Sequence, residues 1–355
     1  MGLTQSQLAI VAKARSVGGG EQGVALTDET CAYLVAVIAR DLDFLPQFPE
    51  IKEEPPAFFG SRPLDALRLP GLDFLAIFER LLTFDPNTDT YFACLAALHK
   101  ARLKYEKILQ TQPVPTVDQV GPRGLLQYGS LRPRALTPFL LWRKWIYDID
   151  NRAGQETGYL FEPIIAYAIG GVPVGARKSP VRRQSDKSKG RQVDCIREKR
   201  AHEIKIRVTI AASGQGRWRE ELEFPADCKA SGFVPVLVVL DPTANPKVEE
   251  LKEKFFQESG EVHIGPEAWG YLESLAGRTM SRFLERYVQR PIEAILAGTP
   301  AAPNELPEMK VKMDEGQFIA SLMDETLVVE RAPEPAEESE SEQLPDGVDD
   351  EVPGP

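Results

Sequence analysis

Hydrophobic and polar residues alternate without interruption along residues 203–210. The alternation sets four branched apolar side chains against four polar ones: Ile204, Ile206, Val208 and Ile210 against Glu203, Lys205, Arg207 and Thr209. Successive side chains of a strand point to opposite faces of its sheet. The pattern therefore predicts a strand at 202–212 with one polar face and one apolar face, the latter packed on a helix.

Similar patterns predict further elements on either side of this strand. A second strand is expected immediately upstream, at 191–198, and an apolar run predicts a buried strand at 233–241. Apolar residues at helical spacing predict four helical stretches around these strands: 139–171, 219–231, 247–258 and 266–296. Within the first of them, Pro163 is expected to start or kink a helix.

The 355 residues exceed one average domain, and three segments differ in composition. Residues 1–123 are expected to form a mainly helical N-terminal region that ends in a proline-rich linker, 111–124. Residues 124–298 contain the predicted strands and are expected to form the core. Residues 299–355 are rich in Pro and Glu, a composition typical of a disordered acidic tail.

Charge is distributed unevenly along the chain, whose net charge is -11. Residues 330–355 hold ten acidic residues and one basic residue, a net of -9, so the rest of the chain carries only -2. Residues 172–207 hold twelve Lys and Arg against four Asp and Glu, a net of +8. Such a basic segment is typical of phosphate binding, although a solvated loop has the same composition.

Several classes of protein are not favoured by the sequence. The longest apolar runs, such as 233–240, are shorter than the roughly 20 residues that cross a bilayer, so we expect a cytoplasmic protein without a membrane anchor. The four cysteines are scattered singly, as are the three histidines. A zinc site or a disulfide framework is therefore not expected.

The two adjacent strands are expected to form a hairpin with a candidate site on its polar face. A turn centred on Lys199-Arg200 pairs Asp194 with Lys205, and it brings Asp194 diagonally opposite Glu203. A divalent cation could lie between the two carboxylates, while the Lys205 ammonium holds a water aimed at a phosphate. A three-residue turn would instead turn Asp194 to the other face, and a solvated strand carries a similar charge pattern.

The residues around this hairpin resemble a known family. Asp194 followed by Glu203-Ile-Lys205, within helix, strand, strand, helix, strand, is similar to the core of the PD-(D/E)XK nucleases. The sequences GYLFEP at 158–163, GG at 170–171 and EIKIRVTIAASGQGRW at 203–218 resemble more narrowly the ApaLI-like restriction endonucleases. The resemblance extends over residues 140–290.

The resemblance implies an α/β fold, a restriction endonuclease-like core with a central mixed sheet flanked by helices. It also implies that Asp194 and Glu203 bind Mg²⁺, that Lys205 positions the attacking water, and that Glu162 is a further catalytic acid. Val193 stands where the family pattern often has proline. Glu198 is the alternative ligand if the hairpin register differs.

Contacts with DNA are expected from two basic segments, a loop at 177–191 and the glycine-containing stretch after the second strand. The candidate DNA-binding residues are Arg177, Lys178, Arg182, Arg183, Lys187, Lys189, Arg191, Arg207, Gln215 and Arg217.

The resemblance implies Mg²⁺-dependent cleavage of double-stranded DNA at a short palindrome of the GTGCAC kind. The cleavage is expected to leave 5′-phosphate and 3′-hydroxyl ends. Cutting both strands of a palindrome requires two symmetric active sites, so we expect a homodimer, with a DNA methyltransferase as its genetic partner. Two alternatives remain open. One is a repair or junction-resolving nuclease with the same core, and the other is a DNA-binding protein without catalysis.

Overall fold

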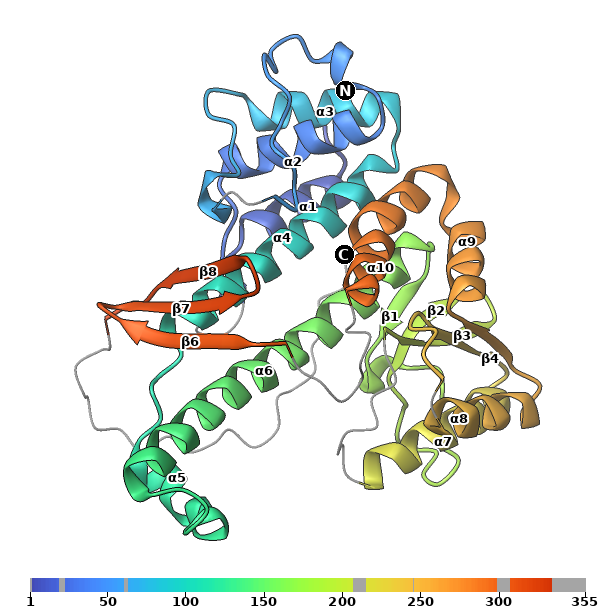
Figure 1. Ribbon diagram of the computed structural model, residues 1–355. Coiled ribbons are helices and arrows are strands. Elements are labelled where there is room, and N and C mark those ends of the chain that lie inside the picture. Colours follow the sequence, from blue (N-terminus) through green and yellow to red (C-terminus); the bar gives the residue numbers. More distant parts are fainter. Residues whose placement is uncertain are drawn as a thin grey trace.

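The computed structural model describes residues 2–18, 23–60, 63–206, 215–244, 246–298 and 307–333. In these parts, helices surround a five-stranded sheet, and a three-stranded sheet lies beside the long helix α6 (Figure 1). The helices are α1 (Gln5–Arg15), α2 (Asp28–Asp41), α3 (Phe74–Phe84), α4 (Thr88–Thr111), α5 (Val117–Gly124), α6 (Pro133–Ala168), α7 (Gln215–Ala230), α8 (Pro246–Gln257), α9 (Pro266–Leu284) and α10 (Arg290–Ala297). None of the helices in the described ranges combines the length and apolar character that a membrane span requires.

The larger sheet is mixed, as expected. Its strands follow the order of the chain: β1 (Val172–Val174), β2 (Val193–Arg197), β3 (Arg200–Lys205), β4 (Val234–Val239) and β5 (Glu261–Ile264). The first three pair antiparallel, whereas β3, β4 and β5 pair parallel. Because α7 connects β3 to β4, the parallel pair is a β-α-β unit.

Helices cover both faces of the sheet, as the contacts of β4 show. Val236 and Val238 belong to the hydrophobic cluster with α6 and α9, whereas Leu237 and Val239 belong to the cluster with α7 and α8. A strand buried on both faces is expected to be uniformly apolar, as β4 is. Ile204 of β3 packs in the first cluster with no exposed surface, so the predicted apolar face does meet helices.

The hairpin turn differs from the expected one. Arg197 pairs with Arg200, so the turn consists of Glu198 and Lys199 rather than being centred on Lys199-Arg200. Glu198 adopts a φ of 55°, a conformation that two-residue hairpin turns require at a central position. The register therefore shifts by two residues, which preserves the face of every side chain and brings Asp194 towards Glu203 instead of Lys205.

The segment before the sheet is more helical than expected. The predicted linker contains α5, and the predicted one or two helices that follow are a single helix, α6, of 36 residues. Pro163 lies inside α6 and starts no new helix. After α6, Gly170 has a φ of 72°, and a Cβ on Gly171 would lie 2.2 Å from the Cys195 sulfur. The glycine pair thus lets α6 end against β2.

Residues 299–355 were expected to be a disordered tail, and the structure corrects this for part of them. Residues 309–330 form an antiparallel sheet of β6 (Met309–Asp314), β7 (Gln317–Leu322) and β8 (Glu325–Glu330). The Phe318 ring packs against Trp145 of α6 with the ring centroids 4.9 Å apart, and Arg331 donates a hydrogen bond to the Leu109 carbonyl at 2.7 Å. The remaining residues, 299–306 and 334–355, lie outside the described part of the chain.

The N-terminal helices share a hydrophobic cluster with α6, the sheet and α9. Asp41 at the end of α2 joins the two parts through polar contacts. Its carboxylate has no exposed surface and accepts hydrogen bonds from Arg286 at 2.6 Å, from Tyr91 at 2.9 Å and from Tyr287. A buried carboxylate is stable only when it is paired in this way, so Asp41 fixes α2 against the helices that follow the sheet.

Candidate active site

Glu203 and Lys205 meet near the C-terminal end of β3. Two residues apart on one strand, their side chains point to the same face, and the Lys205 ammonium lies 2.6 Å from the Glu203 carboxylate. The two side chains are 19% and 14% exposed for Lys205 and Glu203 respectively, so the pair is largely buried but reachable from solvent.

Asp194 approaches the same place from β2. The pairing of β1 with β2 shifts register between Val172 and Val174, whose partners are Ile196 and Val193, so the irregularity includes Asp194. Bulges of this kind change the direction of a side chain. The Asp194 carboxylate accepts a hydrogen bond from the backbone N–H of Ile204 at 2.8 Å, which fixes it beside β3.

The Asp194 carboxyl is in an environment that disfavours its charge. Burial raises the pKa of Asp194 well above its ordinary value, and the charges of Glu203 and Glu162 raise it further. The Lys205 ammonium and the Ile204 N–H act in the opposite direction but do not compensate. Glu162, on α6, is therefore close enough to the hairpin for its charge to act on Asp194.

Glu221 of α7 is a neighbour that sequence reasoning did not identify. Its carboxylate lies 3.6 Å from the Lys205 ammonium. Burial lowers the pKa of Lys205, but the charges of Glu203, Asp194 and Glu221 outweigh it, and the net shift is upward. Lys205 therefore remains an ammonium, a hydrogen-bond donor rather than a proton acceptor.

Glu198, the alternative ligand, does not join this group. It lies in the hairpin turn with a side chain that is 69% exposed, and it contacts Arg197 at 3.8 Å. The two-residue register shift explains its position, because the turn occupies residues 198 and 199.

The arrangement fits a hard divalent cation better than a closed metal site. Among the residues that the structure describes, no three His, Cys, Asp or Glu side chains form a ligand group by themselves. Mg²⁺ in phosphoryl chemistry is typically held by one or two carboxylates, with waters and substrate phosphate as its other ligands. Asp194 and Glu203 supply such oxygens, and a cation between them would oppose the effects of burial and of the neighbouring carboxylates, which raise the pKa of Asp194.

The basic loop at 177–191 is anchored on α7 by hydrogen bonds and ion pairs. Asp227, 3% exposed, accepts hydrogen bonds from the backbone of Gln184 at 2.8 Å and from Arg191 at 2.6 Å. Arg191 is itself buried and is occupied by this ion pair, so it is not placed to contact DNA. Arg183 also has an acidic partner on α7, Glu220 at 2.7 Å.

The remaining candidate DNA-binding residues divide into two groups. Five are exposed on the loop: Arg177, Lys178, Arg182, Lys187 and Lys189. The other three lie where the structure describes no side chains. Arg207 falls outside the described residues, and Gln215 and Arg217 belong to the first turn of α7, whose side chains are not described.

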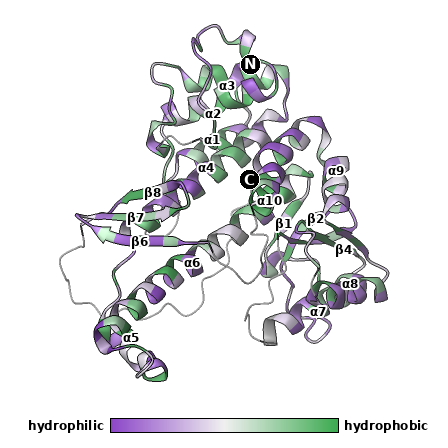
Figure 2. Cartoon of the chain, in the orientation of Figure 1, coloured by the Kyte–Doolittle hydropathy of each residue, from purple (hydrophilic) through white to green (hydrophobic). Residues whose placement is uncertain are grey.

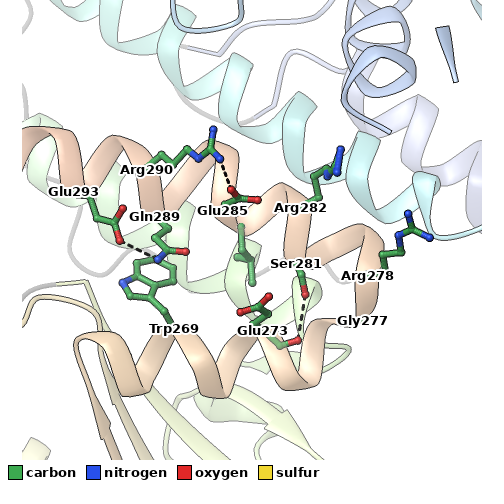
Figure 3. A pocket seen from close by; sticks show the side chains of 11 residues that line it. Trp269, Glu273, Gly277, Arg278, Ser281, Arg282, Glu285, Gln289, Arg290 and Glu293 are labelled. Atoms are coloured by element: carbon green, nitrogen blue, oxygen red, sulfur yellow. Dashed lines mark hydrogen bonds and ion pairs between the residues drawn. The ribbon is translucent and has the colours of Figure 1, made fainter. Parts of the chain in front are cut away.

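A cavity of about 620 Å³ lies away from the hairpin, along α9 and α10 (Figure 3). Its polar side chains largely contact one another. Glu285 pairs with Arg290, Glu293 accepts from Gln289 at 2.9 Å, and Ser281 donates to the Glu273 carbonyl at 3.1 Å. These internal pairs leave the carboxylate group at the hairpin as the stronger candidate for chemistry.

Comparison with known proteins assigns the chain to a family of restriction endonucleases. Residues 73–289, more than half of the chain, match the model of the ApaLI-like restriction endonuclease family. A curated relative, the type II restriction enzyme ApaLI of Acetobacter pasteurianus, is 45% identical over 274 residues, which are 74% of this chain and 73% of the relative. No solved structure matches the chain.

Asp194→Asn is expected to raise the melting temperature at pH 8 in EDTA. The folded-state pKa of Asp194 lies above the unfolded value, about 3.9, so ionisation of this carboxyl costs stability as the pH rises between the two values. The gain should be on the order of 1 kcal/mol or more, about 2–4 °C, and should shrink as the pH falls towards 4. Circular dichroism melts at both pH values measure it, with the exposed Asp324→Asn as control. A lower melting temperature at pH 8 would contradict this description of the site.

Proposed function

The chain belongs to the ApaLI-like restriction endonucleases, and from this membership we propose that it hydrolyses double-stranded DNA at a short palindrome, using Mg²⁺ held by Asp194 and Glu203. The chain is thus a type II site-specific deoxyribonuclease. The further elements of the proposal are the metal, the residues, the six-base palindrome of the GTGCAC kind, and the 5′-phosphate and 3′-hydroxyl ends.

One observation carries the proposed site. The Lys205 ammonium has the carboxylates of Glu203 and Glu221 at 2.6 and 3.6 Å, and the Asp194 charge acts on it as well. Glu203 and Asp194 thus bring carboxylate oxygens to the place where the Lys205 ammonium lies. Carboxylate oxygens are the ligands that Mg²⁺ prefers in phosphoryl chemistry, so we expect the group to bind this cation.

The residues of the group have distinct roles in the proposed reaction. A bound Mg²⁺ supplies polarisation of the phosphoryl oxygen and neutralises developing charge. Lys205 donates a hydrogen bond to the attacking water and orients it towards the phosphorus, while Glu203 and Glu221 hold the ammonium in place. The water oxygen bonds to phosphorus as the bond between phosphorus and the 3′ oxygen breaks. The attacking water releases a proton to solvent and the leaving 3′ oxygen takes one up from solvent, which gives a 5′-phosphate and a 3′-hydroxyl. Glu162, on α6, contributes a negative charge that raises the pKa of the Asp194 carboxyl.

The order of elements supports a PD-(D/E)XK core. α6 is followed by β1, β2 and β3, then by α7 and β4, and the acids lie on β2 and β3 with a lysine two residues after the second. This is the order of helix, strands, helix and strand that the sequence resemblance implies. β3 and β4 pair parallel and are connected through α7, which completes this order.

DNA is proposed to lie against the loop at 177–191, with a second copy of the chain cutting the other strand. The exposed cations of this loop precede β2, so they lie on the segment that leads into the hairpin. We further propose that the enzyme works in the cytoplasm beside a DNA methyltransferase of the same specificity, because a restriction enzyme requires protection of the host sites.

Glu203→Ala and Lys205→Ala are each expected to lower the cleavage rate by at least about 10²-fold, as loss of a group that stabilises transition-state charge does. Loss of Glu203 should also weaken Mg²⁺ binding, whereas loss of Lys205 should leave it intact. Plasmid cleavage and calorimetric Mg²⁺ titration measure the two effects. Arg200→Ala is the matched control, because Arg200 lies at the other end of β3 and pairs with Glu261 at 3.0 Å.

The outcome for Lys205→Ala is decisive for the mechanism. A Lys205→Ala protein that produces the same fragments at the parental rate would exclude the proposed role of the ammonium. Preference of the parental enzyme for branched DNA would favour a junction-resolving nuclease, and binding without cleavage would favour a non-catalytic DNA-binding protein.

Replacing Arg182, Lys187 and Lys189 with Gln should flatten the salt dependence of DNA binding, by about 0.9 in the log–log slope for each lost phosphate contact. The reason is that each neutralised phosphate releases counterions. Fluorescence anisotropy between low and moderate salt measures the slope. The triple variant Lys13→Gln, Lys52→Gln, Arg68→Gln removes the same charge from the N-terminal region and should leave the slope unchanged. Equal slopes for the parental protein and both triple variants would show that the loop cations are solvated and do not contact DNA phosphates.

A further inference from the structure

The first half of α6 projects from the rest of the molecule together with α5 (Figure 1). One side of this half is covered, because Trp145 and Ile149 pack on Phe318 of the three-stranded sheet. Another side is not covered. Phe139, Ile146 and Tyr147 are 46%, 39% and 62% exposed, respectively. Hydrophobic segments along α5 and α6 are visible in Figure 2.

The uncovered side is one continuous stripe, which we call the α6 stripe. Its members recur at helical spacing and line a hollow of about 480 Å³: Phe139, Trp142, Arg143, Ile146, Tyr147 and Asp150. The short helix η3 (Leu125–Gln127) lies alongside, since the Arg143 guanidinium donates a hydrogen bond to the Gln127 side chain at 3.3 Å. Leu125 and Leu126 on η3 are 76% and 92% exposed, which extends the apolar surface.

A group of adjacent, exposed apolar side chains of this size is uncommon on the surface of a monomeric protein. Tyr128, which follows η3, is 71% exposed, and at these exposures Phe139, Tyr147 and Tyr128 each present roughly 100 Å². With the leucines of η3 and Ile146, the surface reaches several hundred Å², which approaches the roughly 800 Å² that each partner contributes to a stable interface.

The charges of the α6 stripe are complementary to those of a second, antiparallel copy of the stripe. Arg143 lies three residues before Ile146, and Asp150 lies three residues after Tyr147. A two-fold axis midway between Ile146 and Tyr147 would therefore place Arg143 opposite the second copy's Asp150, and the reverse. Two identical stripes packed antiparallel thus match basic with acidic ends around an apolar centre, as an isologous interface requires.

We propose that the α6 stripe is the surface through which two copies of this chain associate, with their α6 helices antiparallel about this axis. The proposal rests on the proposed function, because cutting both strands of a palindrome needs two active sites related by a two-fold axis, and each chain has one hairpin site. DNA is a poorer occupant, because apolar side chains and the Asp150 carboxylate gain nothing from phosphates.

The test is a charge exchange across the axis in the full-length protein. Arg143→Asp and Asp150→Arg should each raise the dissociation constant of the dimer at least tenfold, because each variant places like charges opposite one another. The double variant restores opposite charges and should return to within about threefold of the parental value. Sedimentation equilibrium measures the constant, and circular dichroism confirms the fold.

Ile146→Asp, at the centre of the stripe, should also give monomers, whereas Arg278→Asp reverses an exposed charge on α9 and should leave the dimer intact. On supercoiled plasmid, the monomeric variants should accumulate nicked circles, because one site cuts one strand.

The failures of the two proposals are distinguishable. A parental chain that cuts DNA but sediments as a monomer overturns the interface alone, as does a dimer that all of these variants preserve. Weakened DNA binding with an unchanged mass would assign the stripe to DNA and would also overturn it. A dimeric chain that cuts no DNA instead overturns the proposed function.

Discussion

The buried ammonium of Lys205 is the constraint on which the proposed site depends. It is held at 2.6 Å by Glu203 of its own strand and at 3.6 Å by Glu221 of α7, and Asp194 reaches the same place from β2. Burial, together with the charges of Glu203 and Glu162, raises the pKa of Asp194 well above its ordinary value. The proposed divalent cation would favour the ionised form of this carboxyl, so the proposal assigns the metal a role in completing the site.

The fold keeps this group in place from several directions. β3 lies inside the sheet, with its apolar side against helices α6 and α9, so its polar side is fixed by packing. Gly171 lets the end of α6 approach β2 at Cys195, next to Asp194. Asp227 of α7 holds the basic loop, and Glu221 of the same helix contacts Lys205, so α7 joins the basic loop and the proposed catalytic lysine through one element.

The sequence predicted those parts whose pattern is long and regular. The alternation around Ile204 and the apolar run of β4 located the centre of the sheet, and the resemblance indicated the carboxylates. β1 and β5, with three and four residues, are too short to leave a period. The register of β2 against β3 depends on the positive φ of Glu198, and a positive φ at a glutamate cannot be predicted from the amino-acid sequence. Glu221 stands in a run of acids on α7, and only the fold distinguishes the one that reaches Lys205. The three-stranded sheet was obscured by the charged residues around Phe318.

The central claim is that Asp194 and Glu203 hold a divalent cation beside Lys205. Anomalous diffraction from crystals of the full-length protein grown with Mn²⁺ measures this most directly, because it locates the ion independently of activity. We predict a single strong peak in contact with the carboxylate oxygens of both Asp194 and Glu203, lost in crystals of the Glu203→Ala protein. A peak at other carboxylates alone, or the same peak in the Glu203→Ala crystals, would contradict the account.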